Sequence, residues 1–388
     1  MKRYLQIVAS FLTMLCIGGV YAWSIFVPPL INEHSLLTAQ TQLVFGFTIA
    51  VFAVVMIFAG LIEKKRGPRR TALIGAVLYT AGYIVASFSG GGFGLLLIGI
   101  GILSGAGIAF GYVTSLATPI KWFPGYKGLI TGISVAGFGG GAILLAWLTG
   151  NMLNRGIPVL QVFRIVGISY GIVLFLGALL FSVPEKTGTG LNRISLSNKS
   201  LLRDPTVGAL FLTMFAGTFA GLLVIGNLKP IGLHYGISEI HATIAISFLA
   251  VGNMIGRVIW GFISDKLGGR RSIILALTLL TLFTLLIIPA SRSDSFFLFI
   301  PFLVGFGFGA NFVLFAAEVT LLYGSEKLGT VYPYVFLSYG LAGILGPSFG
   351  GWLYDVSRSY TAAIFLAAAI CVLGVAVFWY LIPVRKRN

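Results

Sequence analysis

A short basic stretch between two apolar runs reads Gly60-Leu61-Ile62-Glu63-Lys64-Lys65-Arg66-Gly67-Pro68-Arg69-Arg70. A second stretch with the same layout reads Gly261-Phe262-Ile263-Ser264-Asp265-Lys266-Leu267-Gly268-Gly269-Arg270-Arg271. The paired glycines, Gly60 with Gly261 and Gly67 with Gly268, are each 201 positions apart, and Gly128 and Gly329 share that offset. One offset common to three glycine pairs indicates that the chain consists of two related halves.

Apolar residues dominate the chain of 388 residues: 57% are hydrophobic and only 9% are charged. A soluble domain carries about 25% charged residues, so a soluble chain of this composition could not cover its own surface. Apolar stretches of about 20 residues, each long enough to cross a bilayer core, recur from end to end. Their length and the lack of strict alternation favour helices over a barrel. The twelve predicted spans are 4–29, 41–62, 71–90, 94–118, 128–149, 159–183, 206–228, 239–263, 272–290, 296–322, 330–353 and 360–382.

The basic residues predict how these spans are oriented. A formal net charge of +16 would suggest nucleic acid in a soluble protein, but here the charges lie in short loops between apolar spans. With twelve spans, 20 Lys and Arg residues fall on the side of both termini and 5 on the opposite side. Basic residues gather in cytoplasmic loops. We therefore expect a multi-pass protein of the cytoplasmic (inner) membrane, with both termini in the cytoplasm, lipid around it and no nucleic-acid partner.

The longest polar stretch follows the sixth span and contains Gly, Ser, Asn and basic residues. A stretch of this composition is typical of a linker. The predicted organisation is an N-terminal six-helix bundle over 1–184, a cytoplasmic linker over 185–205 and a C-terminal six-helix bundle over 206–388.

The second basic stretch resembles the signature loop of the major facilitator superfamily, and the resemblance covers the whole chain. It implies an all-α membrane protein of twelve transmembrane helices in two pseudo-symmetric six-helix bundles, with the substrate near the midplane. The first copy departs from the signature, because Lys64 stands at the usual Asp position and Glu63 precedes it.

Arg257 is the clear case of a charge inside a predicted span. A charge at bilayer depth costs at least ~2.5–3.5 kcal/mol, so it is a functional candidate by default. Asn253, four residues earlier, projects from the same helix face. The guanidinium matches a carboxylate in a planar, bidentate way, which predicts an anionic substrate. The alternative is a structural Arg257 that snorkels or pairs with a carboxylate near the cytoplasmic face, such as Glu318. Glu318 is itself a candidate proton carrier or a pairing partner at the cytoplasmic rim.

Three further segments narrow the resemblance: Gly18-Gly19-Val20-Tyr21-Ala22-Trp23-Ser24, Lys121-Trp122-Phe123-Pro124-Gly125-Tyr126-Lys127-Gly128-Leu129-Ile130-Thr131-Gly132, and Gly309-Ala310-Asn311-Phe312-Val313-Leu314-Phe315. Together they are similar to the oxalate/formate antiporter family, which is close to the monocarboxylate transporters. The pair formed by Asn253 and Arg257 also resembles the Asp-x-x-x-Arg of the eighth helix of the monocarboxylate transporters.

The resemblance implies a set of substrate-binding residues. In it, Arg257 matches the carboxylate-binding Arg, and the aromatic residues of the first, fourth, fifth, tenth and eleventh helices match pocket positions. These aromatic residues are Tyr21, Tyr112, Phe138, Phe312 and Tyr339. Helix packing is the alternative role for each of them.

Two departures from the family shape the predicted substrate. Oxalate exchangers of this family carry a Lys on the eleventh helix, where this chain has Tyr339. One intramembrane cation suits a monoanion, so we expect a small monocarboxylate such as lactate, pyruvate, acetate or formate. Asn253 in place of Asp removes one candidate proton carrier, and Arg257 and Glu318 remain as candidates for proton coupling. The expected activity is secondary active transport by alternating access, with proton symport, in a protein that functions as a monomer.

The sequence predicts neither an enzyme nor a cofactor or metal site. It contains no nucleophile elbow, phosphate loop or group of metal-ligand spacing. His34, His234 and His241 fall in or beside outward loops and are expected to be solvated. The other functional classes left open are an oxalate/formate-type exchanger, a drug or cation exporter of the same fold that would use a buried carboxylate such as Glu318, and a non-transporting receptor or scaffold.

Overall fold

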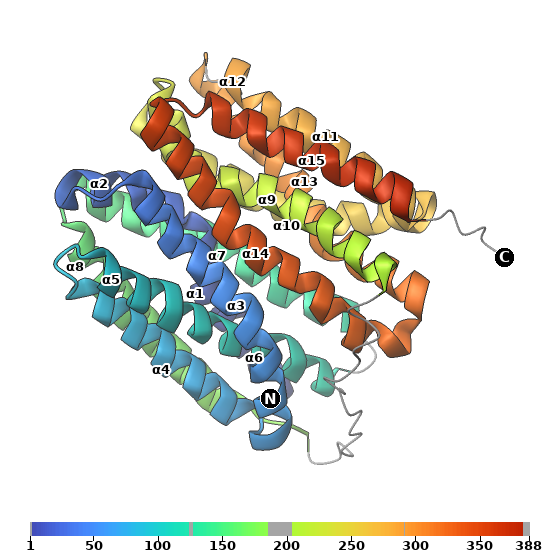
Figure 1. Cartoon of the computed structure of the whole chain (residues 1–388). Helices are drawn as coiled ribbons and strands as arrows, with labels where there is room; N and C mark the ends of the chain where they lie inside the picture. The colour runs from blue at the N-terminus through green and yellow to red at the C-terminus, as the bar shows by residue number, and fades with distance from the viewer. Residues whose placement is uncertain (1, 124–126, 185–203, 291, 383–388) are drawn as a thin grey trace. The chain divides into compact units, whose positions relative to one another are not determined.

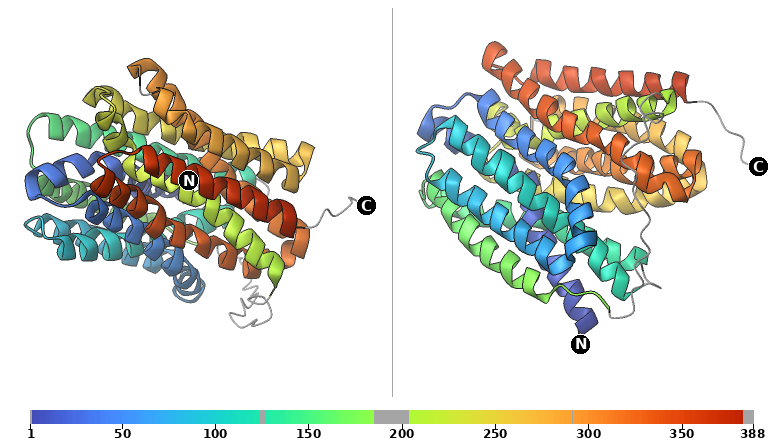
Figure 2. Two further views of the ribbon diagram at one scale, coloured as in Figure 1. Left: turned by 45° about the horizontal axis from the view of Figure 1, so that its top comes forward. Right: turned by 60° about the horizontal axis from the view of Figure 1, so that its bottom comes forward.

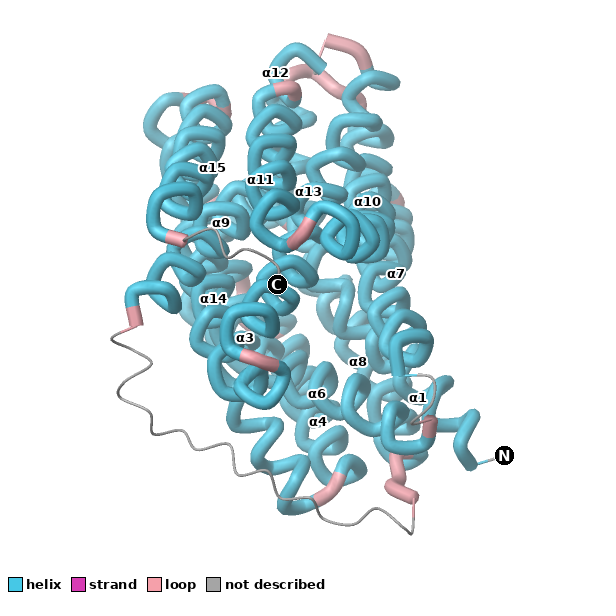
Figure 3. Tube along the Cα trace, turned by 90° about the vertical axis from the view of Figure 1, so that its right-hand side faces the viewer, coloured by secondary structure: helices cyan, strands magenta, loops and turns pink. Residues whose placement is uncertain are grey.

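The computed structural model of the chain describes residues 2–123, 127–184, 204–290 and 292–382, and within these ranges it consists of helices and loops without strands (Figure 3). The chain divides into two compact units, Met1–Gly190 and Leu191–Asn388. Most of the predicted linker, 185–203, lies outside the described residues. The all-α membrane fold expected from the sequence is confirmed.

The first unit runs from blue to green in Figure 1. Its elements are α1 (Lys2–Ile17), the 3₁₀-helix η1 (Gly18–Ile25), α2 (Val27–His34), α3 (Thr38–Arg66), α4 (Pro68–Ser87), α5 (Phe93–Leu96), the π-helix η2 (Leu97–Ser104), α6 (Gly105–Trp122), α7 (Lys127–Asn154) and α8 (Val159–Leu180). The first predicted span is therefore a helix interrupted by a tighter segment at its glycines, and α2 continues five residues past its predicted end at 29.

The second unit runs from green to red. Its elements are α9 (Pro205–His234), α10 (Glu239–Leu267), α11 (Gly269–Leu285), α12 (Ile287–Ala290), α13 (Asp294–Tyr323), α14 (Ser325–Ser357) and α15 (Thr361–Leu381). Figure 2 shows from two further sides that the long helices of each unit pack alongside one another.

Among the described residues, eleven helices are long and apolar enough to cross a membrane. The predicted span at 330–353 lies within α14, which has 33 residues and is not among the eleven. Two prolines and several tyrosines and glycines lower the apolar character of α14, although its length exceeds what a bilayer requires.

The repeated glycines have a shared conformational cause. Gly67 ends α3 with φ 79° and ψ 166°, and Gly268 ends α10 with φ 82° and ψ 154°. A residue with a side chain rarely adopts a positive φ, so both turns require glycine. In each case the next helix begins at the following residue. The two copies of the basic stretch are therefore the same helix–turn–helix element.

Close helix packing explains part of the high glycine content. A Cβ atom at Gly252 of α10 would fall on the carbonyl oxygen of Phe302 of α13, whereas one at Gly261 would meet only the Val313 side chain, at 3.7 Å. Small residues let backbones approach in this way where lipid provides no hydrophobic drive for helix association.

A carboxylate caps α9, the first helix of the second unit. Asp204 caps α9, where Oδ1 accepts a hydrogen bond from the backbone N–H of Thr206 at 2.8 Å and Oδ2 accepts one from the Tyr323 hydroxyl at 2.7 Å. Burial acts to raise the pKa of Asp204, but these hydrogen bonds outweigh it and hold that pKa below its ordinary value.

Candidate functional site

Arg257, on α10, is held by two contacts. Its Nε donates a hydrogen bond to Oδ1 of Asn253 at 3.1 Å, one turn earlier on the same helix. Its guanidinium carbon lies 4.5 Å from the ring centroid of Phe312 on α13, so the planar cation stacks on the aromatic face. Asn253 is buried, with 3% of its surface exposed, and Arg257 is partly exposed. The sequence prediction that Asn253 and Arg257 share one face therefore holds.

The charge of Arg257 has no counter-ion among the described residues, since none of their carboxylates lies within ion-pair distance of it. The hydrogen bond to Asn253 uses Nε, and the contact with Phe312 is a cation–π contact of the guanidinium. They leave the two terminal nitrogens with donor groups that can point at a ligand. A planar fork of this kind binds a carboxylate in two parallel hydrogen bonds.

Aromatic side chains from α14 pack against Phe312 of α13. The ring of Phe312 meets that of Tyr339 at 5.3 Å and 78°, and that of Phe336 at 6.2 Å. Tyr332 adds a hydroxyl that donates to the backbone oxygen of Phe312 at 3.3 Å. The prediction included Phe312 and Tyr339 but missed Phe336 and Tyr332. A signal was present, because positions 332, 336 and 339 lie on one face of a helix.

The three predicted aromatic residues of the first unit form a cluster of their own. Tyr21 of η1 meets Phe138 of α7 edge to face at 5.5 Å, and Tyr112 of α6 meets Phe138 at 5.4 Å. Phe52 of α3 completes the cluster through a ring contact with Tyr112 at 5.2 Å. The structure thus gathers Tyr21, Tyr112 and Phe138 within unit 1, and Arg257, Asn253, Phe312 and Tyr339 within unit 2.

Glu318, a residue of α13, lies elsewhere and packs against the turn between α10 and α11. A Cβ atom at Gly269 would collide with Oε2 of Glu318, and among the described residues no ion pair joins Glu318 to Arg257. The neighbouring Arg270 donates to the backbone oxygens of Ile382 at 2.6 Å and Trp379 at 2.8 Å. The alternative in which Glu318 neutralises Arg257 is therefore wrong: Glu318 packs against the signature turn of the second unit.

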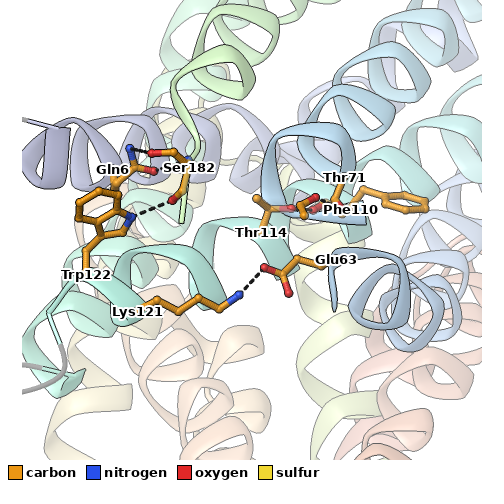
Figure 4. Close-up of polar contacts among 9 residues, drawn as sticks. Gln6, Glu63, Thr71, Phe110, Thr114, Lys121, Trp122 and Ser182 are labelled. Carbon is orange, nitrogen blue, oxygen red and sulfur yellow. Dashed lines mark hydrogen bonds and ion pairs between the residues drawn. The ribbon is translucent and has the colours of Figure 1, made fainter. Parts of the chain in front are cut away.

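The first unit has a different carboxylate near its copy of this turn (Figure 4). Glu63, 5% exposed, accepts from the Lys121 ammonium at 2.7 Å and so ties the end of α3 to the end of α6. Next to this pair, Gln6 of α1 and Trp122 of α6 both bond to Ser182 beyond α8. The charge at Glu63 therefore stabilises contacts between helices, even though the usual Asp position carries Lys64.

Lys229 is a buried cation that was predicted to lie in an outward loop. The predicted span ended at residue 228, but α9 continues to His234, and Lys229 is only 1% exposed. Its ammonium is 2.9 Å from Oε1 of Glu239, at the first residue of α10. Glu239, ten residues later in the sequence, is a possible counter-ion for Lys229, and its presence could have indicated a longer helix.

The histidines are less exposed than predicted. His34 packs on Gly91, and His234 makes ring contacts to Tyr235, Tyr354 and Tyr360. His241 is bonded to Ser238 at 2.7 Å and lies 2.9 Å from a carboxylate oxygen of Asp294. Across the described residues, no group of three or more His, Cys, Asp or Glu side chains can hold a metal ion.

Long apolar helices in two units with related turns, and a cation inside one span that has no carboxylate partner in the described part of the chain, are the features of a multi-pass membrane carrier. The chain belongs to the Major Facilitator Superfamily, which it matches over residues 9–336 and 210–388. This superfamily consists of carriers, so the protein is a transporter and not an enzyme.

Curated relatives agree with this assignment over nearly the whole chain. The chain is 26% identical to the oxalate:formate antiporter of Oxalobacter formigenes, covering 100% of this chain and 93% of that protein. It is also 26% identical to the uncharacterized MFS-type transporter YhjX of Escherichia coli (strain K12), covering 88% and 86%. The chain is also 26% identical to monocarboxylate transporter 13 of Rattus norvegicus, in an alignment that covers 94% of this chain and 85% of that protein.

Proposed function

We propose that the protein moves a small monocarboxylate of the lactate, pyruvate, acetate or formate type across the cytoplasmic membrane. The observation that carries the proposal is Arg257, a guanidinium stacked on Phe312 and without a carboxylate partner among the described residues. A substrate carboxylate would supply the missing charge, and the rings of Tyr339 and Phe336 would contact its apolar end. Relatives named for oxalate, formate and monocarboxylates support a small organic anion as the substrate class.

The proposed mechanism is alternating access. The substrate carboxylate would be bound at Arg257, with Asn253 fixing the orientation of the guanidinium, and the protein would alternate between states open to either side of the membrane. The aromatic cluster of Tyr21, Tyr112 and Phe138 is the proposed contribution of the first unit. Proton symport would keep the cycle electroneutral, because each net charge moved through the membrane potential is worth ~2.3 kcal/mol per 100 mV.

The proposed orientation follows from the 20-to-5 distribution of basic residues and places both termini in the cytoplasm, in an inner membrane. The proposed functional state is the monomer, since each chain contains both aromatic clusters. Lipid and protons are the further partners in this proposal.

An oxalate/formate-type exchanger is the second candidate, and the antiporter that aligns with the full chain favours it. A dianion would benefit from a second cation, whereas Tyr339 stands at the position of the exchangers' Lys. A drug or cation exporter on this fold needs a buried carboxylate in its cavity. The candidate for that role, Glu318, packs against Gly269 instead.

Proteoliposomes test the proposal. Uptake of labelled lactate and of labelled oxalate would be measured with and without an inward proton gradient, for the wild type, for Arg257→Lys and for the control Arg155→Lys at an exposed position. We expect gradient-stimulated lactate uptake that is lost in Arg257→Lys and kept in Arg155→Lys. Rapid oxalate exchange against preloaded formate, without lactate uptake, would replace the monocarboxylate proposal with the exchanger.

A further inference from the structure

Helices α4 and α8 of the first unit form an apolar groove on their outer surface. The groove has a volume of about 560 Å³, and its lining includes Val77, Thr80 and Ile84 of α4 and Ile168, Ile172 and Phe175 of α8. Figure 1 shows these two helices side by side along one edge of the unit.

The floor of the groove is a close helix contact. A Cβ atom at Gly171 of α8 would collide with the Thr80 hydroxyl of α4, so the two backbones approach closely at this level. The rims are large side chains that point outward, with Val77 60% and Ile172 56% exposed. Both helices are membrane-spanning candidates, so this exposed apolar face meets hydrocarbon chains and not water.

A cation lies just beyond one end of the groove. Arg164 is one turn before Ile168 on α8, and Phe88 is one turn after Ile84 at the end of α4, so both lie on the groove-lining faces of their helices. The Arg164 guanidinium carbon is 4.6 Å from the Phe88 ring centroid. No carboxylate of the described residues lies within ion-pair distance of Arg164.

We propose that this groove binds one anionic phospholipid, with an acyl chain between α4 and α8 and the phosphate on Arg164. The apolar groove runs along the span, where the acyl chain of such a lipid lies. The cation is at the end of the groove, at the level of the anionic headgroup. The contact with the Phe88 ring uses none of the guanidinium N–H groups as a hydrogen-bond donor to a carboxylate, and phosphate oxygens can accept from them. With the orientation proposed above, the lipid comes from the outer leaflet.

A transmembrane helix of a partner protein fits these observations less well. It would need a carboxylate at the single level of Arg164, whereas every anionic phospholipid of that leaflet presents a phosphate at this level. The lipid satisfies both the apolar and the charged part of the site with one molecule.

The experiment is a titration of delipidated, purified protein with phosphatidylglycerol, followed by native mass spectrometry. The variants are Arg164→Gln, which removes the cation, and Ala81→Phe, which places a ring in the groove lined by that alanine. Their matched controls are Arg155→Gln and Val54→Phe, at exposed positions outside the groove.

We expect a phosphatidylglycerol adduct that is about tenfold weaker in Arg164→Gln, because a charge-assisted hydrogen bond is lost. We expect it to be similarly weaker in Ala81→Phe and unchanged in both controls. Thermal unfolding of each variant in the same detergent establishes that a loss of lipid does not follow from misfolding. Equal phosphatidylglycerol binding by Arg164→Gln and Arg155→Gln would overturn the proposal. A dimer mass that disappears in Arg164→Gln would also overturn it, in favour of a helix partner.

Discussion

Replacing Asn253 with aspartate would put a carboxylate where an amide oxygen now meets Arg257. The two side chains are nearly equal in size, so the 3.1 Å contact from Nε should persist and become a charge-assisted hydrogen bond. Such a bond contributes about 1.5–3 kcal/mol. A substrate carboxylate must then compete with an internal one, so we expect Asn253→Asp to weaken lactate binding by about 10- to 100-fold.

The same substitution should make binding depend on pH. Protonation turns the introduced carboxylate into a neutral group and releases the guanidinium for the substrate. The affinity of Asn253→Asp for lactate should therefore rise as the pH falls. The wild type has no carboxylate at Arg257 among the described residues, so its affinity should change less over the same range.

Isothermal titration calorimetry of the purified protein with lactate, at about pH 7 and about pH 5, measures both effects. Asn151→Asp is the matched control, because it makes the same chemical change at an exposed residue of α7. If Asn253→Asp binds lactate as tightly as the wild type at the higher pH, the guanidinium of Arg257 does not hold the substrate.

Three further predictions concern stability, each measured by thermal unfolding in detergent. Glu239→Gln leaves the buried ammonium of Lys229 unpaired and should lower the melting temperature by several degrees, whereas Lys229→Met should be nearly neutral; equal losses would contradict this asymmetry. The depressed pKa of Asp204 stabilises the folded state above the carboxyl's ordinary pKa of about 4, and this stabilisation is lost as the pH falls through the folded-state value. Asp204→Asn should therefore reduce the loss of stability between about pH 6 and about pH 3, and an unchanged pH profile would argue against the role of that carboxyl. Gly252→Ala should destabilise the protein by more than about 2 kcal/mol, because its Cβ has no space, while the control Gly261→Ala should not; similar melting temperatures would refute the close packing of α10 on α13.

The helices were predictable from the sequence because a bilayer imposes a length and a composition on every span. Their predicted ends were wrong where polar residues belong to the helix. α9 continues through Lys229, whose charge is neutralised by Glu239, and α2 continues to His34, which packs on Gly91. A hydropathy pattern ends at the first polar residue, whereas the helix ends where its backbone hydrogen bonds and side-chain contacts end.

The candidate site was predictable to the extent that its contacts are local. Asn253 and Arg257 are four residues apart on one helix, so their hydrogen bond follows from spacing alone. The ring of Phe312 under Arg257 and the partners of Glu63 and Glu318 depend on which helices are neighbours, and no spacing within one helix encodes that. The resemblance to a known family supplied the aromatic positions, but it did not indicate Phe336 or Tyr332.

The charge of Arg257 also bears on the transport cycle. Asn253 has no ionisable group, Glu318 packs against Gly269 at the turn after α10, and no carboxylate of the described residues lies within ion-pair distance of Arg257. An empty carrier would then have to reorient with an uncompensated cation inside the span, which is costly, whereas the carrier with bound carboxylate is neutral at that point. Exchange of internal for external lactate should therefore be faster than net uptake. Asn253→Asp neutralises the empty site, so it should narrow the difference between the two rates even while it weakens binding; if the difference is unchanged in that variant, the charge of Arg257 does not limit the return of the empty carrier.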